Sequence, residues 1–515
     1  MSRDRTLPPR AGWLWCACIV AAGPFAALPV TAAPAALIAH HAVSTRDAEA
    51  QRQFDQGLTL IYAFNPEEAT FHFQEAARRD PKLAMAFWGI ALAAGPNINT
   101  GYDLRRARIG RQAAELALRL AAHAPPEERA YIETVRQRYD ATDARQALLA
   151  QKAYAKAMKA LARAYPGDVD ASVLYAESLM DLTPLHMWLG SGVPNTYTRE
   201  VIALLDAALK RNPRHVGALH YLIHTYEASP TPGKALDAAR RLAAATLPDG
   251  AEHLAHMPSH IFMRTGDYDG AIAANLKALS MFARLIHDEH SDVHNGYYRH
   301  DDQVLDYAYM MSGQWSKAHA AAQAIATQSA DNAAGIETYL RFHRWREVLA
   351  LSPPSDPDTR WRFATAMAQA GVGDLADARS GLRALAEMRG RDARTQLART
   401  QLAAQIDIAE GRSDAAIGEL RSATRIQDRL PVREPPAWYY PVRETLGARL
   451  ALAGKFRAAA AVFQEDLRGN PNNPRSLYGL ATVLKQVDPG RAPVVQRAFE
   501  KAWRHADVSL TLEDL

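Results

Sequence analysis

The chain has 515 residues, more than one hydrophobic core usually serves, so several domains or one extended repeat array are expected. Apolar residues make up 48% and aromatic residues only 8%, because alanine, the strongest helix former, supplies much of the apolar share. The 60 Lys and Arg residues against 56 Asp and Glu residues give a net charge of +4. This near balance argues against nucleic acid as a primary partner, since phosphate binding requires a basic face.

Residues 1–32 predict an export signal. Three arginines and one aspartate precede or begin an apolar run, and Val30-Thr31-Ala32 resembles a cleavage site. An N-terminal membrane anchor is the alternative, but one glycine and two prolines interrupt the run. Both cysteines, Cys16 and Cys18, lie in this leader, so its removal leaves no thiol and a net charge of +2. No later segment is long and apolar enough to span a bilayer, so we predict a soluble periplasmic or secreted protein.

From about residue 50 the sequence predicts helices of roughly 10–15 residues, joined by short turns that Gly or Pro marks. One unit, residues 53–81, carries small, aromatic and proline residues at fixed offsets: Gly57, Ala69, Phe73, Ala76 and Pro81. Near the other end of the chain the same offsets return at Gly447, Ala459, Phe463 and Pro471. Asp466 departs from the pattern there, because it stands where a small residue is expected.

These offsets resemble those of the tetratricopeptide repeat, a helix-turn-helix unit of about 34 residues. The resemblance implies an all-α, right-handed superhelical solenoid of roughly nine or ten units. In such a unit the small residues lie where two helices touch, and Phe73 fills the groove between them. We expect an N-terminal array over residues 33–350 and a C-terminal array over residues 351–515, joined by the proline-rich segment 352–358. Insertions interrupt the period at residues 95–103, 183–198 and 282–300.

Half of the 18 histidines lie between residues 218 and 300. Two pairs among them, His220 with His224 and His256 with His260, have i, i+4 spacing, so both imidazoles of a pair share one helix face. In the repeat register both pairs fall at the fifth and ninth positions of a first helix. The resemblance implies that these positions face a concave groove.

The register also brings other side chains to this His-rich groove. Glu177 falls at the ninth position of the preceding unit and should complete one patch with the two histidine pairs. His253, His294 and His300, in flanking segments, are further candidates for the same patch.

Two imidazoles at i, i+4 can chelate one metal ion, and a carboxylate or third histidine then completes a zinc, copper or iron site. The alternative is that the histidines hydrogen-bond a peptide or acidic ligand, or stabilise neighbouring helices. The sequence leaves both interpretations open. No H-E-x-x-H motif is present, so a zincin-type protease is not indicated.

Pro258 falls inside an expected helix, so the helix either begins at this proline or kinks there. The segment HMPSHIFMRTGDY, from His256 to Tyr268, resembles one in a group of exported bacterial repeat proteins without an established activity. His40 and His41, near the predicted mature N-terminus, are expected to be disordered.

The sequence thus predicts an exported repeat protein that binds a protein, peptide or small-molecule ligand in its groove, around a histidine-rich centre. A metal-dependent enzyme built on the solenoid is the alternative. A protein–protein scaffold with incidental histidines is a third hypothesis, since a fold of this kind does not select among these functions.

Overall fold

The computed structural model describes residues 36–139, 141, 143–190, 192–285, 292–328, 335–388 and 392–515. Residues 36–515 form one compact unit, whereas the predicted export signal lies outside the described residues. Throughout these ranges the regular structure is helical, and extended pairing is limited to isolated bridges such as Asn97 with Thr100. The all-α prediction is confirmed. None of the described helices combines the length and the hydropathy needed to cross a membrane.

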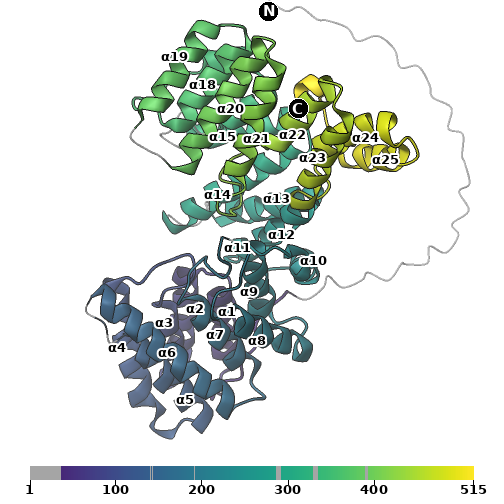
Figure 1. Cartoon of the computed structure of the whole chain (residues 1–515). Coiled ribbons are helices and arrows are strands. Elements are labelled where there is room, and N and C mark those ends of the chain that lie inside the picture. The colour runs from purple at the N-terminus through teal and green to yellow at the C-terminus, as the bar shows by residue number, and fades with distance from the viewer. Residues whose placement is uncertain are drawn as a thin grey trace, which may run out of the picture. The chain divides into compact units, whose positions relative to one another are not determined.

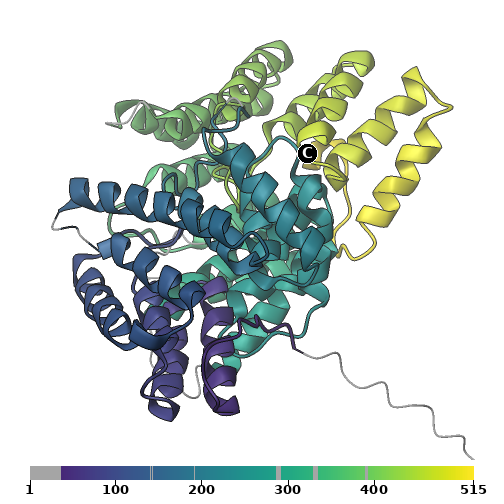
Figure 2. The same ribbon diagram turned by 90° about the horizontal axis from the view of Figure 1, so that it is seen from below.

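Successive helices pack against one another as antiparallel pairs (Figure 1), and Figure 2 shows the same pairs from below. The first part of the chain forms α1 (Ala48–Tyr62), α2 (Pro66–Arg79), α3 (Ala84–Ala93), α4 (Leu104–Leu120), α5 (Pro126–Arg136), α6 (Ala144–Ala164), α7 (Val169–Met180) and α8 (Thr198–Arg211). The middle part forms α9 (Val216–Glu227), α10 (Leu236–Ala244), α11 (Glu252–His256), α12 (Pro258–Thr265), α13 (Tyr268–Leu285), α14 (Asp292–Met311), α15 (Trp315–Gln328), α16 (Ile336–Arg341) and α17 (Trp345–Ala350). The last part forms α18 (Thr359–Gly371), α19 (Leu375–Glu387), α20 (Ala393–Ala409), α21 (Ser413–Gln427), α22 (Val442–Leu452), α23 (Phe456–Gly469), α24 (Pro474–Val487) and α25 (Ala492–Ala502).

The unit formed by α1 and α2 shows why the repeat offsets matter. Phe73, on α2, is fully buried. A Cβ atom added to Gly57, on α1, would lie 2.8 Å from its ring, and one added to Gly89, on α3, would overlap the same ring. Glycine therefore lets α1 and α3 approach Phe73, which fills the gap between the helices as the repeat resemblance implies.

The C-terminal unit repeats this contact, with Phe463 of α23 between glycines of α22 and α24. Asp466, where a small residue is expected, is buried and accepts hydrogen bonds from Asn473 Nδ2 at 2.7 Å and Ser476 Oγ at 2.6 Å. Burial, with the nearby charge of Glu444, raises the pKa of this carboxyl to about 6. Asp466, the residue that departs from the repeat pattern, thus links α23 to α24 through hydrogen bonds.

Because these contacts recur at both ends, the described chain is a tetratricopeptide-like helical solenoid; its right-handed superhelical sense stays a prediction. The three largest hydrophobic cores of the described residues follow one another along the chain, from Leu37 to Ala318, from Ile336 to Ile406 and from Leu397 to Leu515. The first core contains the helices that carry the histidine pairs. The division of the array at residue 350 stays a prediction.

The C-terminal helices also contact the middle of the array. Arg475, buried on α24, donates a hydrogen bond at 3.0 Å to a backbone carbonyl near the end of α14. The carboxylate of Asp507 accepts a hydrogen bond from the backbone N–H of Ser316 at 2.9 Å. Gly266, with φ of +74°, lies so close to the carbonyl of Pro471 that any side chain would clash. These contacts join repeats that are far apart in sequence.

Replacing Phe73 by alanine should destabilise the protein strongly. The substitution leaves a cavity between helices that cannot close over it, and truncations of this kind cost about 3–5 kcal/mol in the free energy of unfolding. Chemical unfolding followed by circular dichroism should measure the loss. Phe71, on the same helix and 51% exposed, is the matched control. Phe71→Ala should change the free energy by less than about 0.5 kcal/mol, and equal effects of the two substitutions would contradict the role given to Phe73.

Candidate metal centre

Six histidines gather into two neighbouring groups of three. The first trio is His220, His224 and His253, and the second trio is His256, His260 and His300. Within each trio, one ring nitrogen of every histidine lies within 4.8 Å of the others. His300 is half-buried and the remaining members are buried. Each pair recognised in the sequence is therefore joined by a third imidazole from a flanking segment.

Helices α9 and α11 place the first trio. His220 and His224 are one turn apart on α9, and His253 lies near the start of α11. Phe64, in the turn after α1, packs its ring on all three imidazoles with centroid distances of 4.6, 5.6 and 5.6 Å. The φ of Phe64 is +57°, which is strained for a bulky residue. The turn therefore tolerates backbone strain while its aromatic ring covers the first trio.

Hydrogen bonds determine which ring nitrogen is free in two histidines of the first trio, His220 and His224. His220 Nδ1 lies 2.6 Å from the carbonyl oxygen of Tyr62, and His224 Nδ1 lies 3.0 Å from Glu227 Oε1. A neutral imidazole carries one hydrogen, and these acceptors assign it to Nδ1, so each Nε2 keeps its lone pair. The Nε2 atoms of His224 and His253 lie 3.4 Å apart. The buried Nε2 of His220 has no hydrogen-bond partner among the described residues.

Helices α11, α12 and α14 place the second trio. The chain stays helical at Met257, and Pro258 is the first residue of α12, where a helix has no need of the missing N–H. Pro258, which the sequence analysis expected inside a helix, thus lies at the junction of α11 and α12. Across this junction His256 and His260 stay in ring contact with each other and with His300 of α14.

Oxygen atoms also lie beside the Nδ1 atoms of two histidines in the second trio. His256 Nδ1 hydrogen-bonds Asn275 Oδ1 at 2.7 Å, and His260 Nδ1 lies at ion-pair distance, 2.8 Å, from Glu227 Oε2. The Nε2 atoms of His256 and His260 then face each other at 2.8 Å, and the Nε2 of His300 lies 3.4 Å from that of His260. Two lone pairs at 2.8 Å repel unless a proton or a metal ion lies between them.

Burial disfavours the charged imidazolium in most of these histidines. Burial, reinforced by neighbouring imidazoles, lowers the pKa well below its usual value for His220, His253 and His300. Burial also acts on His256, but the carboxylate of Asp301, 3.0 Å from its Nδ1, outweighs it and raises the pKa. Neutral imidazoles are the form that binds metal ions, so burial favours coordination by His220, His253 and His300, whereas the raised pKa of His256 opposes it.

Glu227, the last residue of α9, contacts both trios. Its Oε1 lies 3.0 Å from His224 Nδ1 and its Oε2 lies 2.8 Å from His260 Nδ1. Burial acts to raise the pKa of this carboxyl, but the two histidines outweigh burial and lower the pKa. The repeat register did not select Glu227, because it lies beyond the groove positions. Its place three residues after His224 was the available sequence signal.

Among the residues proposed from the sequence, Glu177 is not part of the trios and the side chain of His294 is not described. Glu177 lies on α7, with a carboxylate oxygen 3.9 Å from Arg138 Nη2, and Arg138 also pairs with Asp181 at 2.5 Å. The repeat register assigned Glu177 to the histidines, but its partner is Arg138, a buried residue of an earlier unit. His294 lies on α14, but its side chain is outside the described residues.

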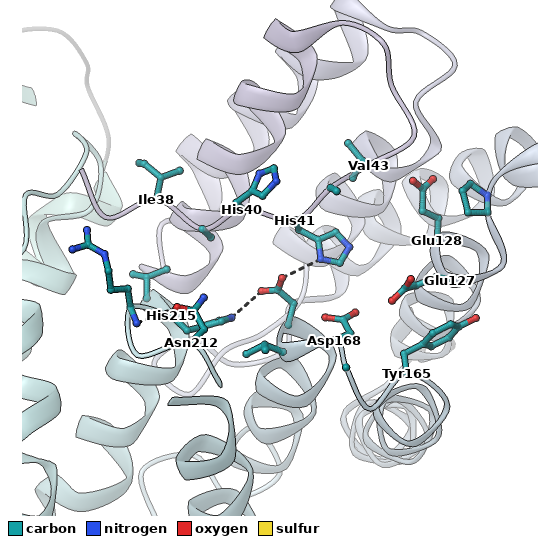
Figure 3. Close-up of a pocket in the computed structure, with 18 of the residues that line it drawn as sticks. Ile38, His40, His41, Val43, Glu127, Glu128, Tyr165, Asp168, Asn212 and His215 are labelled. Carbon is teal, nitrogen blue, oxygen red and sulfur yellow. Dashed lines mark hydrogen bonds and ion pairs between the residues drawn. The ribbon is translucent and has the colours of Figure 1, made fainter. Parts of the chain in front are cut away.

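A third group of possible ligands, His41, Asp168 and Asp170, lies in a pocket of about 1150 Å³ (Figure 3). Asp170 accepts hydrogen bonds from the Tyr62 hydroxyl at 2.5 Å, from His41 Nδ1 at 3.0 Å and from His215 Nε2 at 3.0 Å. Asp168 accepts from the backbone as the N-cap of α7. Because these carboxylates already have donors within the chain, the group holds structural elements together.

The same pocket anchors the N-terminal segment, residues 36–44. The backbone N–H of His41 donates to Asp55 Oδ1 at 3.1 Å, and His40 Nδ1 lies 2.7 Å from Asp55 Oδ2. Glu128 accepts from the backbone at the end of the segment at 2.5 Å. The expectation that His40 and His41 are disordered is wrong, because carboxylates on separate helices hold them in place.

No protein-family model and no curated protein matches this chain. A structure of the human IFIT1 dimer with m7Gppp-AAAA is 14% identical in sequence, covers 90% of this chain and 92% of that chain, and has a TM-score of 0.32. A structure of the APC/C hetero-tetramer Cut9-Hcn1 is 11% identical, covers 90% of this chain and 95% of that chain, and has a TM-score of 0.28. Similarity at this level carries no functional conclusion for this chain.

Asp170→Asn should loosen the N-terminal segment. An amide cannot accept charge-assisted bonds from His41 and His215, and such bonds contribute about 1.5–3 kcal/mol. Hydrogen exchange at residues 37–44 should therefore become about 10–100-fold faster. His40→Ala is the control, because 68% of that side chain is exposed, and it should leave the exchange rates within about twofold.

The protection of the segment should also depend on pH. Burial lowers the pKa of His41, but the hydrogen bond and charge of Asp170 outweigh burial and raise it. The contribution of this ion pair is therefore fully present below the usual histidine pKa of about 6.5 and is lost as the pH rises through the raised value. In acid it is lost as the pH falls through the lowered pKa of Asp170. Protection that is independent of pH between about 5 and 9, after correction for intrinsic exchange, would rule out this role.

Proposed function

We propose that this chain is an exported helical-repeat binding protein that holds transition-metal ions in its two histidine trios. One observation carries the proposal. Oxygen atoms of Tyr62, Glu227 and Asn275 lie beside the Nδ1 atoms of four of the six imidazoles, so that the Nε2 atoms of these four face buried space. Metal-binding histidines use this arrangement, in which an outer acceptor fixes the ring and a free nitrogen faces the ion.

The spacing of the Nε2 atoms supports this proposal. Two nitrogen ligands about 2.0–2.1 Å from a tetrahedral ion lie about 3.3 Å apart. The Nε2 atoms are 3.4 Å apart between His224 and His253, and also between His260 and His300. The 2.8 Å between His256 and His260 suits a smaller angle at the ion, as in tetragonal copper sites. With imidazole ligands and no thiol after signal removal, zinc, copper and iron remain the candidate metals.

The helical-repeat architecture supports the binding role more broadly. Stacked repeats present extended surfaces to proteins, peptides or small molecules, and we place such a ligand on the groove face of an array that spans residues 33–350. Three imidazoles also leave a further coordination position at each trio. Zinc sites with three protein ligands are typical of enzymes, whereas structural sites have four. This favours a metal-dependent enzyme as the second candidate function.

The untagged protein should bind transition metal in proportion to chain. Titration with zinc, copper or iron, read by elemental analysis after gel filtration, should give stoichiometric metal. His224→Ala combined with His260→Ala removes one ligand of each trio and should lower the affinity at both by at least about 100-fold. The helical circular-dichroism signal should remain, because stability is spread along the array.

An exposed histidine provides the matched control for this titration. His186→Ala should leave the stoichiometry unchanged, since that ring lies outside both trios. Binding should weaken below about pH 6, because protonated imidazoles cannot coordinate. If the wild-type chain takes up none of the three metals, the metal-binding and enzyme proposals both fail. Cobalt(II) distinguishes the metal-binding proposal from the enzyme proposal. Azide added to the cobalt-loaded protein changes its visible spectrum only if the ion has an open coordination position, as the enzyme proposal requires.

The export proposal rests on residues 1–32 and has its own test. When the full chain is produced in a bacterium with a periplasm, the protein recovered from the periplasmic fraction should begin at Ala33. Mass spectrometry of the intact protein measures this, with a precursor in which Ala32→Arg blocks the cleavage site as the control. Full-length protein confined to the cytoplasm would contradict the export proposal and leave the metal proposal untouched.

A further inference from the structure

The two trios share one carboxylate. Glu227 directs one oxygen to His224 of the first trio and the other oxygen to His260 of the second trio, at 3.0 and 2.8 Å. The side chain of Glu227 is only 15% exposed, and the two histidine side chains are 4% and 10% exposed. In this buried setting a single side chain contacts a histidine of each trio.

The two trios also share one short helix. His253 of the first trio and His256 of the second trio lie one turn apart on α11, and their rings stack with centroids 6.2 Å apart. A shift of α11 therefore moves a ligand of each trio together. The carboxylate and the helix are independent links between the same two groups of histidines.

We propose that the six histidines form a single two-ion centre, in which Glu227 couples the ions by holding one ligand of each. The proposal rests on the metal binding proposed above and adds how the two sites are related. Two cations this close repel one another, and the negative charge of Glu227 lowers that repulsion while its oxygens orient both rings. The centre would take two transition-metal ions per chain, with imidazole as the ligand on both.

Glu227→Gln tests the coupling because the amide has the same shape and only one acceptor oxygen. That oxygen can accept the Nδ1–H of either His224 or His260, and the NH₂ group then faces the other Nδ1 as a donor. The second histidine must move its hydrogen to Nε2, where it blocks the lone pair that binds the ion. The loss of negative charge weakens the remaining site as well.

The experiment titrates metal-free protein with zinc and, separately, with Cu(II). The wild-type chain should bind two ions, and Glu227→Gln should lower the affinity for both by at least about tenfold, the usual effect of removing an outer carboxylate. Two Cu(II) ions held by neighbouring rings should broaden each other's electron paramagnetic resonance signal. His300→Ala, which changes a half-buried ring of the second trio, should bind one Cu(II) and give the sharp signal of an isolated ion.

Matched variants separate the coupling from general damage. Glu177→Gln changes a buried glutamate of the neighbouring unit and should leave both affinities within about threefold, because Glu177 pairs with Arg138. Circular dichroism of metal-free Glu227→Gln should match the wild type. The two-ion centre would be overturned if two bound Cu(II) ions gave the sharp resonance signals of isolated ions. It would also be overturned if Glu227→Gln kept one site at wild-type affinity. Either result would leave the metal-binding proposal intact. A wild-type chain without any metal would overturn both proposals.

Discussion

The arrangement of this protein depends on how closely its helices approach one another at small residues. Phe73 and Phe463 each lie against glycines of the two adjacent helices, at opposite ends of the chain. Because this contact fixes both the spacing and the rotation of neighbouring helices, equivalent positions in successive units reach equivalent places. Histidines that are far apart in sequence, such as His224 and His260, therefore meet around a common carboxylate.

Periodic features of the chain were predictable from the sequence, and features that depend on one distant partner were not. The repeat offsets predicted the helix pairs and the two histidine pairs, since both follow from spacing alone. The register placed Glu177 beside the histidines, but Arg138 of another unit pairs with it instead. Glu227 was missed because its role depends on α12 folding back over the end of α9. His41 was misjudged because Asp170, its partner, lies 129 residues further on.

The histidine-rich region is more deeply buried than the resemblance to the repeat family implies. A groove position would leave imidazoles open to solvent, whereas His220 and His256 are completely buried. Phe64 covers one trio, and the helix junction at Pro258 brings His256 and His260 into contact in the other. A site enclosed in this way keeps water out and strengthens every charge interaction within it, including those of Glu227.

Arrays whose repeats touch only their neighbours lose their end units first, because nothing distant holds those units in place. The hydrogen bond from Arg475 to the end of α14 is a contact between distant units that opposes this loss here. The same helix carries His300, so the terminal repeats are mechanically linked to the second trio. A partner that bound to the last helices, about 200 residues beyond His300 in the sequence, would therefore act on the helix that carries this histidine.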